Sequence, residues 1–195
     1  MYINMKNAAY IQFNKAQLDK IGYTIVYLST RIPQLSKTKL LKLLYILDEI
    51  SIKKGGIPFL NLTYKLWKLG PVSKELFIDL SSEPKLLESF IERHIDGEKI
   101  YIKPKILFVD DEFSDNDIEL IDYVIDKYGS ETAKDLVSYT HRLNSPWYNT
   151  AIENNVLELL KNESINSTDY SIDMSQLISH DRRKKEVYFD YLESH

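Results

Sequence analysis

The sequence predicts a mainly α-helical domain of the α+β class, with a multi-helix core and a small two- to three-stranded antiparallel sheet. Apolar residues recur at helical spacing along most of the 195 residues,. Two short stretches, 62–69 and 98–109, instead alternate apolar and polar residues as strands do,. The composition, 44% hydrophobic and 28% charged, is that of a globular protein,. A chain of this length fits one domain with a short extension.

Residues 1–13 are predicted to form a loose start, and two helices follow at about 15–31 and 37–53. Asn14 and Ser36 stand immediately before these helices and are residue types that cap helix N-termini. Apolar residues cover nearly the whole circumference of the second helix. That pattern predicts a helix in the centre of the fold.

The stretch 62–69 is predicted to be extended, and Gly70-Pro71 after it is typical of a turn,. A helix is expected at about 73–81, with Ser73 as its cap. A second short helix is expected to begin near Pro84, since proline suits a first helical position,.

The stretch 98–109 is predicted to form a hairpin or two short strands. Ile100 and Ile102 alternate with charged residues, and residues 106–109 then form a short apolar run,. Together with 62–69, these strands could form one small antiparallel sheet.

Two helices are expected next, at about 115–128 and 131–141. Ser114 followed three residues later by an aspartate resembles a capping motif,. Gly129 is expected to end the first helix in the left-handed conformation, and Ser130 to cap the second,.

The C-terminal part is also predicted to be helical. Ser145 as a cap and Pro146 at the first helical position begin a helix that is broken near Asn154,. A loop is expected at 161–171 and helix again at about 173–193.

The whole chain divides into three predicted parts. These are the loose start at 1–13, a helical domain at 14–153, and a helical C-terminal extension at 154–195 that packs on the same domain.

Composition excludes several classes of protein. The absence of cysteine excludes disulfides, thiol nucleophiles and cysteine metal sites,. The start of the chain lacks the features of a signal peptide, and no apolar run approaches the roughly 20 residues that span a bilayer,. We therefore expect a cytoplasmic protein with no membrane partner. Because the formal net charge is -4, nucleic acid is not the expected partner,.

The sequence shows no pattern typical of catalysis or of metal binding. The acidic residues at 110–112, with Asp115 and Asp117, lack the spacing of a calcium loop and are expected to be a solvated turn and helix start,. The histidines are too scattered for a helical zinc motif, and no serine lies in a glycine-flanked elbow,. We predict no catalytic residue, metal or cofactor, and expect that the protein is not an enzyme. An enzyme of another type is the remaining alternative.

A basic run, Arg182, Arg183, Lys184 and Lys185, is expected to lie between helices. Four adjacent cations could contact phosphates or an acidic partner,. They could equally form a solvated helix face.

Four further residues each allow two interpretations. Trp67 and Trp147 are core residues or binding residues. His141 lies at the end of a predicted helix. It is either a protonated imidazole that interacts favourably with the helix dipole, or a capping or core histidine. Lys42 lies in a leucine-rich helix, and its amine either reaches a carbonyl or carboxylate, or extends to solvent,.

Three motifs in one order resemble a known family. They are the leucine-rich stretch 39–45, the Trp-x-x-Gly-Pro-Val stretch 67–72, and Thr140-His141 followed by Ser-Pro-Trp at 145–147. The chain resembles the Panacea domain, or SocA-like antitoxin domain, of phages and bacteria over about residues 18–150. Position 46 departs from the pattern, because Ile46 stands where relatives often carry a second aromatic residue.

The resemblance implies an antitoxin of a toxin–antitoxin system that binds and neutralises a protein toxin encoded nearby. One branch of the family acts instead as an adaptor that delivers its toxin to a protease. A nucleic-acid-binding regulator that uses 182–185 is the second alternative. The family-motif positions, which either contact the partner or build the scaffold, are Lys42, Tyr45, Trp67, Gly70, Pro71, Val72, His141, Pro146 and Trp147.

Overall fold

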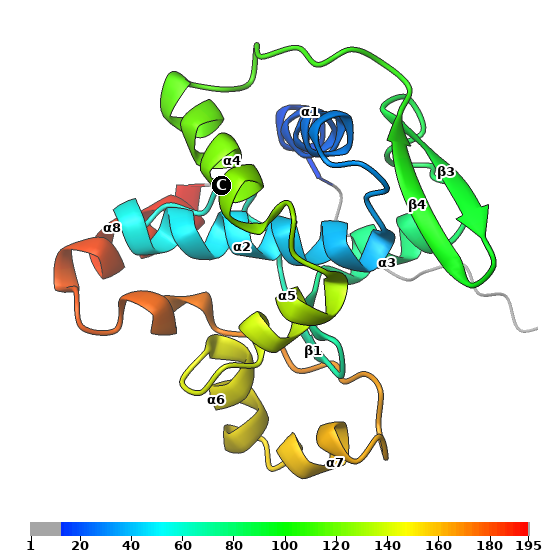
Figure 1. Ribbon diagram of the computed structural model, residues 1–195. Coiled ribbons are helices and arrows are strands. Elements are labelled where there is room, and N and C mark those ends of the chain that lie inside the picture. Colours follow the sequence, from blue (N-terminus) through cyan, green and yellow to red (C-terminus); the bar gives the residue numbers. More distant parts are fainter. Residues whose placement is uncertain (1–12, 195) are drawn as a thin grey trace, which may run out of the picture.

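The computed structural model describes residues 13–194, so nearly all of the predicted loose start lies outside the described residues. Figure 1 shows the arrangement of the helices and strands. In chain order they are α1 (Lys15–Arg31), α2 (Lys37–Gly55), β1 (Lys65–Trp67), β2 (Gly70–Val72), α3 (Lys74–Ser81), β3 (Ile91–Asp96), β4 (Lys99–Pro104), α4 (Asp115–Tyr128), α5 (Ala133–Thr140), α6 (Pro146–Glu153), α7 (Leu157–Lys161), the 3-10 helix η1 (Met174–Ile178) and α8 (Arg182–Ser194).

The predicted fold class is confirmed, and α2 is the central helix. In Figure 1, α2 crosses the middle of the molecule, with α1 above it and α5 and α6 below. It packs against α3, α4, α5, α8, η1, β2 and β4. Its apolar residues are buried around almost the whole circumference, from Leu40 to Ile52. Most of the other elements are therefore positioned by contact with one helix.

Helix starts are where local sequence predicted the structure best. Asn14 and Ser36 accept hydrogen bonds from backbone N–H groups in the first turns of α1 and α2. Ser114 and Asp117 form a reciprocal capping box at the start of α4. At the start of α6, the Ser145 side chain accepts a hydrogen bond from the backbone N–H of Tyr148. These predictions hold because a cap depends only on residues within one turn.

The β1–β2 hairpin corrects the predicted position of the turn. Lys68 and Leu69 form the turn, and Gly70 and Pro71 belong to β2, where Gly70 pairs with Trp67. A proline is tolerated there because β2 is the edge strand of its sheet,.

The other side of β1 is covered by a distant segment of the chain. The backbone N–H of Leu66 donates to the carbonyl of Tyr170 at 3.0 Å, and that of Ile172 donates to the carbonyl of Tyr64 at 2.8 Å. The loop expected at 161–171 is therefore partly a third, irregular strand of this small sheet.

The second hairpin, β3–β4, is separate from the first. The predicted joint sheet is wrong, and so is the strand expected at the 106–109 run, because β4 pairs with residues 91–96. The helix expected near Pro84 does not form. The Asp79 carboxylate accepts the backbone N–H groups of residues 85–87 at 2.7 to 3.2 Å, which satisfies them in an irregular turn,.

Two cap predictions around α4 and α5 are also wrong. Gly129 has φ −66° and is right-handed, so its backbone conformation does not require glycine. Lack of space requires it instead, because a Cβ would collide with the carbonyl of Ile125. Thr132, not Ser130, caps α5, because Asp135 completes a second capping box with it.

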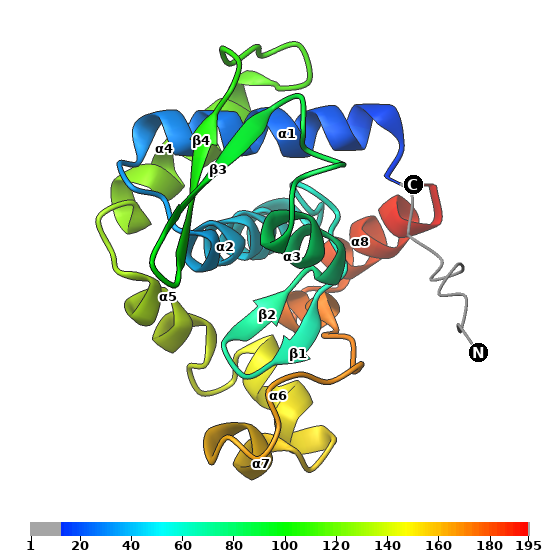
Figure 2. The same ribbon diagram turned by 90° about the vertical axis from the view of Figure 1, so that its right-hand side faces the viewer.

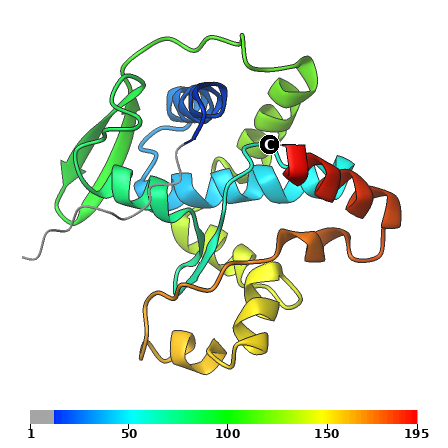
Figure 3. The same cartoon turned by 180° about the vertical axis from the view of Figure 1, so that it is seen from behind.

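The C-terminal elements lie against the central helix. The break after α6 is confirmed, with Asn155 at φ 57°. The helical prediction for 173–193 corresponds to η1 followed by α8, and both contact α2. Figure 3 shows α8 from behind, beside the end of α2. The boundary between a domain at 14–153 and an extension at 154–195 stays a prediction.

Candidate functional site

The family-motif residues come together where the β1–β2 hairpin meets α2, α5 and α6. Figure 2 shows this hairpin between α3 and α6. On one side β2 contacts α2 and α5, and β1 contacts α6. We call this contact region the hairpin junction and define it by Lys42, Trp67, Gly70, His141 and Trp147.

Trp147 connects three elements in the junction. Its indole N–H donates to the backbone carbonyl of Trp67 at 2.8 Å, and the side chain is only 3% exposed. Its ring stacks on His141 with centroids 3.7 Å apart. The hydroxyl of Ser145 donates to the carbonyl of Thr140 at 2.8 Å, which holds α6 to the end of α5. Trp147 is therefore buried where it joins α6 to the hairpin and to the end of α5.

Lys42 is buried in the junction and does not extend to solvent. It is 1% exposed, and its Nζ donates to the carbonyl of Pro71 at 2.7 Å. Burial penalises the charged amine and lowers the pKa of Lys42 to about 7,. Of the two interpretations of the sequence, the one in which the amine reaches a carbonyl is confirmed.

Gly70 is the point where the hairpin touches both neighbouring helices. Its φ of 97° lies in the region that favours glycine,. A Cβ at this position would stand 2.5 Å from Oγ1 of Thr140 and 3.1 Å from Cε of Lys42. Backbone conformation and lack of space therefore both require glycine here.

His141 is the C-cap residue of α5. Its Nε2 is buried and has no hydrogen-bond partner within residues 13–194. Burial, and then the charge of Lys42, lower the pKa of His141 to about 4. Both effects disfavour the protonated imidazole, which favours the interpretation as a capping or core histidine.

Tyr45 lies outside the hairpin junction. Its ring packs edge-on against Tyr64, with centroids 5.1 Å apart. Burial and the nearby Glu49 carboxylate raise its pKa well above the usual value. Sequence analysis did not single out Glu49, which is fully buried and accepts hydrogen bonds from Arg142 and from Tyr139 at 3.3 Å. The sequence signal for this pair was Arg142, which directly follows the motif residue His141. The fold is what places Arg142 beside α2.

Val72 and Pro146 position their neighbours. Val72 is buried at the end of β2, and Pro146 is the buried first residue of α6. Val72 thus marks the end of the hairpin, and Pro146 places Trp147 in the first turn of α6.

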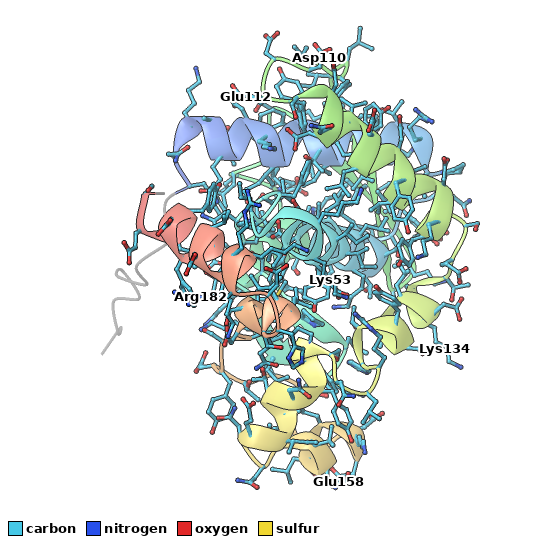
Figure 4. The ribbon with its side chains drawn as sticks, turned by 90° about the vertical axis from the view of Figure 1, so that its left-hand side faces the viewer. Lys53, Asp110, Glu112, Lys134, Glu158 and Arg182 are labelled. Atoms are coloured by element: carbon cyan, nitrogen blue, oxygen red, sulfur yellow. The ribbon has the colours of Figure 1, made fainter. Side chains whose placement is uncertain are left out.

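The basic run begins α8 and does not lie between helices. Arg182 pairs with Glu186 at 2.9 Å, and Lys184 donates to the carbonyl of Lys53 at 2.7 Å. Figure 4 shows Arg182 at the start of α8 and Lys53 on α2. Arg183 is exposed and Lys185 is half-buried. At least one of the four cations thus holds α8 against α2.

The acidic residues at 110–112 are exposed, and Figure 4 shows Asp110 and Glu112 on the loop above α4. Asp117 is part of the α4 capping box. The expectation of a solvated turn and helix start is confirmed. Within residues 13–194, no three His, Cys, Asp or Glu side chains are grouped so that they could hold a metal ion. In the same part of the chain, no helix is both long and apolar enough to cross a membrane.

An open groove lies along the hairpin next to the junction, and the junction residues Lys42 and Trp67 also line it. It has a volume of about 290 Å³. Its floor and walls come from α2, the hairpin, α3 and the segment before residue 170. The lining residues are Thr38, Leu41, Lys42, Trp67, Lys68, Leu69, Val72, Phe77 and Asn166. We call it the hairpin groove.

These features define a mainly helical domain in which a buried lysine of the central helix and a tryptophan of α6 hold a Gly-Pro hairpin. Residues 40–148, more than half of the chain, match the family model described as antitoxin SocA-like, Panacea domain. The chain belongs to this family. The match includes every family-motif position and excludes the basic run, and it begins within α2, later than the resemblance suggested. No curated protein and no solved structure matches the chain.

Proposed function

We propose that this protein is an antitoxin that neutralises a protein toxin by binding it directly, and that it acts by binding and not by catalysis. Membership of the SocA-like antitoxin family over residues 40–148 is the observation that carries this proposal. The toxin is the product of a neighbouring gene, and the complex forms in the cytoplasm.

The geometry of the hairpin junction supports binding over catalysis. A reacting group needs access to its substrate. The Lys42 amine and the Trp147 indole are instead buried, and each donates a hydrogen bond to a backbone carbonyl. Both groups join elements of the scaffold. The family motif thus holds the hairpin in place, and the exposed side of the hairpin is free for a partner.

The test is to express this chain together with the product of each adjacent gene. We expect one product to stop growth by itself, the present chain to restore growth, and the two proteins to co-purify. Failure of the chain to rescue growth from any neighbouring product would contradict the proposal.

The same experiment separates direct neutralisation from delivery to a protease. Direct neutralisation leaves the toxin at an undiminished level in the rescued cells, bound to this chain. Delivery to a protease would make the toxin disappear as growth recovers, and a blot for the tagged toxin measures the difference.

A further inference from the structure

We propose that the hairpin groove receives one bulky apolar side chain of the partner, and that this side chain is flanked by acidic residues. The inference rests on the proposed function, since it names the surface and the chemistry with which the toxin is bound.

The size of the groove suits a single side chain. A cavity of roughly 150 Å³ is enough to hold a benzene ring, and the groove measures about 290 Å³. Sites for drug-sized ligands and cofactors start at roughly 300 Å³. The groove is therefore large enough for one phenylalanine, leucine or tryptophan side chain and lies at the lower limit for drug-sized ligands,.

The walls are apolar, and part of this surface is exposed. Trp67 meets Phe77 edge to face with centroids 4.8 Å apart, and Leu41 and Val72 complete the wall. Leu69 at the tip of the turn is 51% exposed. Tryptophan is enriched at the energetic centre of protein interfaces, and an exposed apolar patch beside it is typical of an interaction site.

The charge at the groove is opposite in sign to that of the whole chain. The chain carries a formal net charge of -4, yet none of the described residues that line the groove is acidic. Of its two lysines, Lys68 brings its ammonium to the rim, whereas Lys42 is buried on the Pro71 carbonyl and adds no accessible charge. A third lysine, Lys37, lies 4.3 Å above the Phe77 ring. This local excess of positive charge is complementary to an acidic partner segment.

Two carboxylates near the rim can be exchanged for those of a partner. Glu163 pairs with Lys68 at 2.8 Å, and Asp169 lies 3.6 Å from Lys74. Both carboxylates are largely exposed, and exposed ion pairs contribute little to stability,. Partner carboxylates could therefore take over Lys68 and Lys74 without a large loss.

The groove is formed before a partner arrives. The Trp67 indole N–H donates to the carbonyl of Thr168 at 3.1 Å, while the Trp67 carbonyl accepts from Trp147. The tryptophan is thus held on both sides. A preformed wall lowers the ordering cost of binding.

The first experiment uses peptide probes and the full chain labelled with nitrogen-15. The sequence has 2 tryptophans, so the spectrum has two indole signals, assigned by the one that Trp67→Phe removes. The probe is a blocked pentapeptide with phenylalanine between two pairs of glutamates. We expect a saturable shift of the Trp67 signal with this probe. The same peptide with lysines for glutamates, or alanine for phenylalanine, should bind at least tenfold more weakly.

Matched variants place the binding on the groove. Leu69→Glu and Lys68→Glu should each weaken the probe at least tenfold. Leu107→Glu, on an 88% exposed residue of the loop between β4 and α4, adds the same charge elsewhere and should change affinity less than twofold. Each variant is compared only after its thermal unfolding matches that of the unmutated protein.

The contrary outcomes are distinct. The absence of a saturable Trp67 shift at millimolar probe, or equal shifts with all three peptides, would overturn the groove inference. So would a dimer in sedimentation that Leu69→Glu converts to a monomer, since a second copy would then occupy the groove. Rescue of growth without probe binding overturns the groove inference alone, whereas probe binding without any neutralised toxin overturns the proposed function alone.

Discussion

The two sides of the β1–β2 hairpin differ in what they contact. The inner side, in the hairpin junction, is buried: the carbonyls of Trp67 and Pro71 accept hydrogen bonds from Trp147 and Lys42. The outer side, in the hairpin groove, is open and carries the half-exposed Leu69. Most family-motif residues therefore lie in or beside the hairpin junction, and three of them, Lys42, Trp67 and Val72, also line the groove. The residues proposed to bind a partner lie beside them in sequence.

The residues that mark the family and the residues proposed to bind a partner are under different structural constraints. Gly70 is required by its backbone conformation and by the close approach of Thr140, whatever the partner is. Leu69, one residue earlier, has no comparable constraint from the fold.

The largest effect is expected at Trp147. Trp147→Ala removes a buried ring and leaves the Trp67 carbonyl without its donor, so the free energy of unfolding should fall by about 3–5 kcal/mol,. Urea unfolding measures the change. If the variant unfolds within about 1 kcal/mol of the unmutated protein, the inner side is not the scaffold.

A smaller loss is expected at Gly70. Gly70→Ala combines backbone strain at φ 97° with a collision against Thr140, so stability should fall by about 3 kcal/mol,. Gly97→Ala is the matched control, because Gly97 has φ 58° with no atom within 4 Å of a Cβ. The control should lose only about 1 kcal/mol from strain. Equal losses would show that the contact with Thr140 contributes nothing.

Local sequence specified some features of this fold and not others. The helices and most caps were predictable because the periodicity of α2 and pairs such as Ser114 and Asp117 act within a few residues. The turn at Lys68 was not predictable, because the position of the hairpin depends on the distant Tyr170 and Trp147. The irregular segment after α3 was missed because Asp79 satisfies its backbone from outside the local pattern.

The resemblance indicated part of the hairpin junction, but not the contacts that each of its residues makes. The resemblance identified Lys42, His141 and Trp147, but their burial and pKa values arise from elements far apart in sequence. Glu49 and Arg142 were not singled out, because their pairing joins α2 to the end of α5 across the fold. The groove, too, depends on tertiary structure, since Asn166 and Phe77 line it together.

A pH dependence is expected from Lys42. Its pKa is about 7 in the folded protein and 10.5 in the unfolded chain, so the unfolded state binds more protons between these values. Stability should therefore rise with pH in this window, by about 2–3 kcal/mol between about pH 7 and pH 9. Lys42→Met should remove this rise, and calorimetry of both proteins across the window measures it. A rise of the same size in the variant would assign it to another group.

The smallest effect on stability is expected on the outer side. Leu69→Glu changes a half-exposed turn residue, so the free energy of unfolding should change by less than about 0.5 kcal/mol,. Urea unfolding beside Leu107→Glu checks this. A loss above about 2 kcal/mol would show that Leu69 belongs to the scaffold, and would remove the contrast between the two sides of the hairpin.

The most direct test of the two-sided hairpin is the affinity of the neutralised toxin for the folded Leu69→Glu protein, measured by calorimetric titration beside Leu107→Glu. The account predicts that Leu69→Glu, although as stable as the unmutated protein, binds the toxin at least tenfold more weakly, while Leu107→Glu binds it normally. Undiminished binding by a folded Leu69→Glu protein would contradict the claim that the outer side of the hairpin holds the toxin.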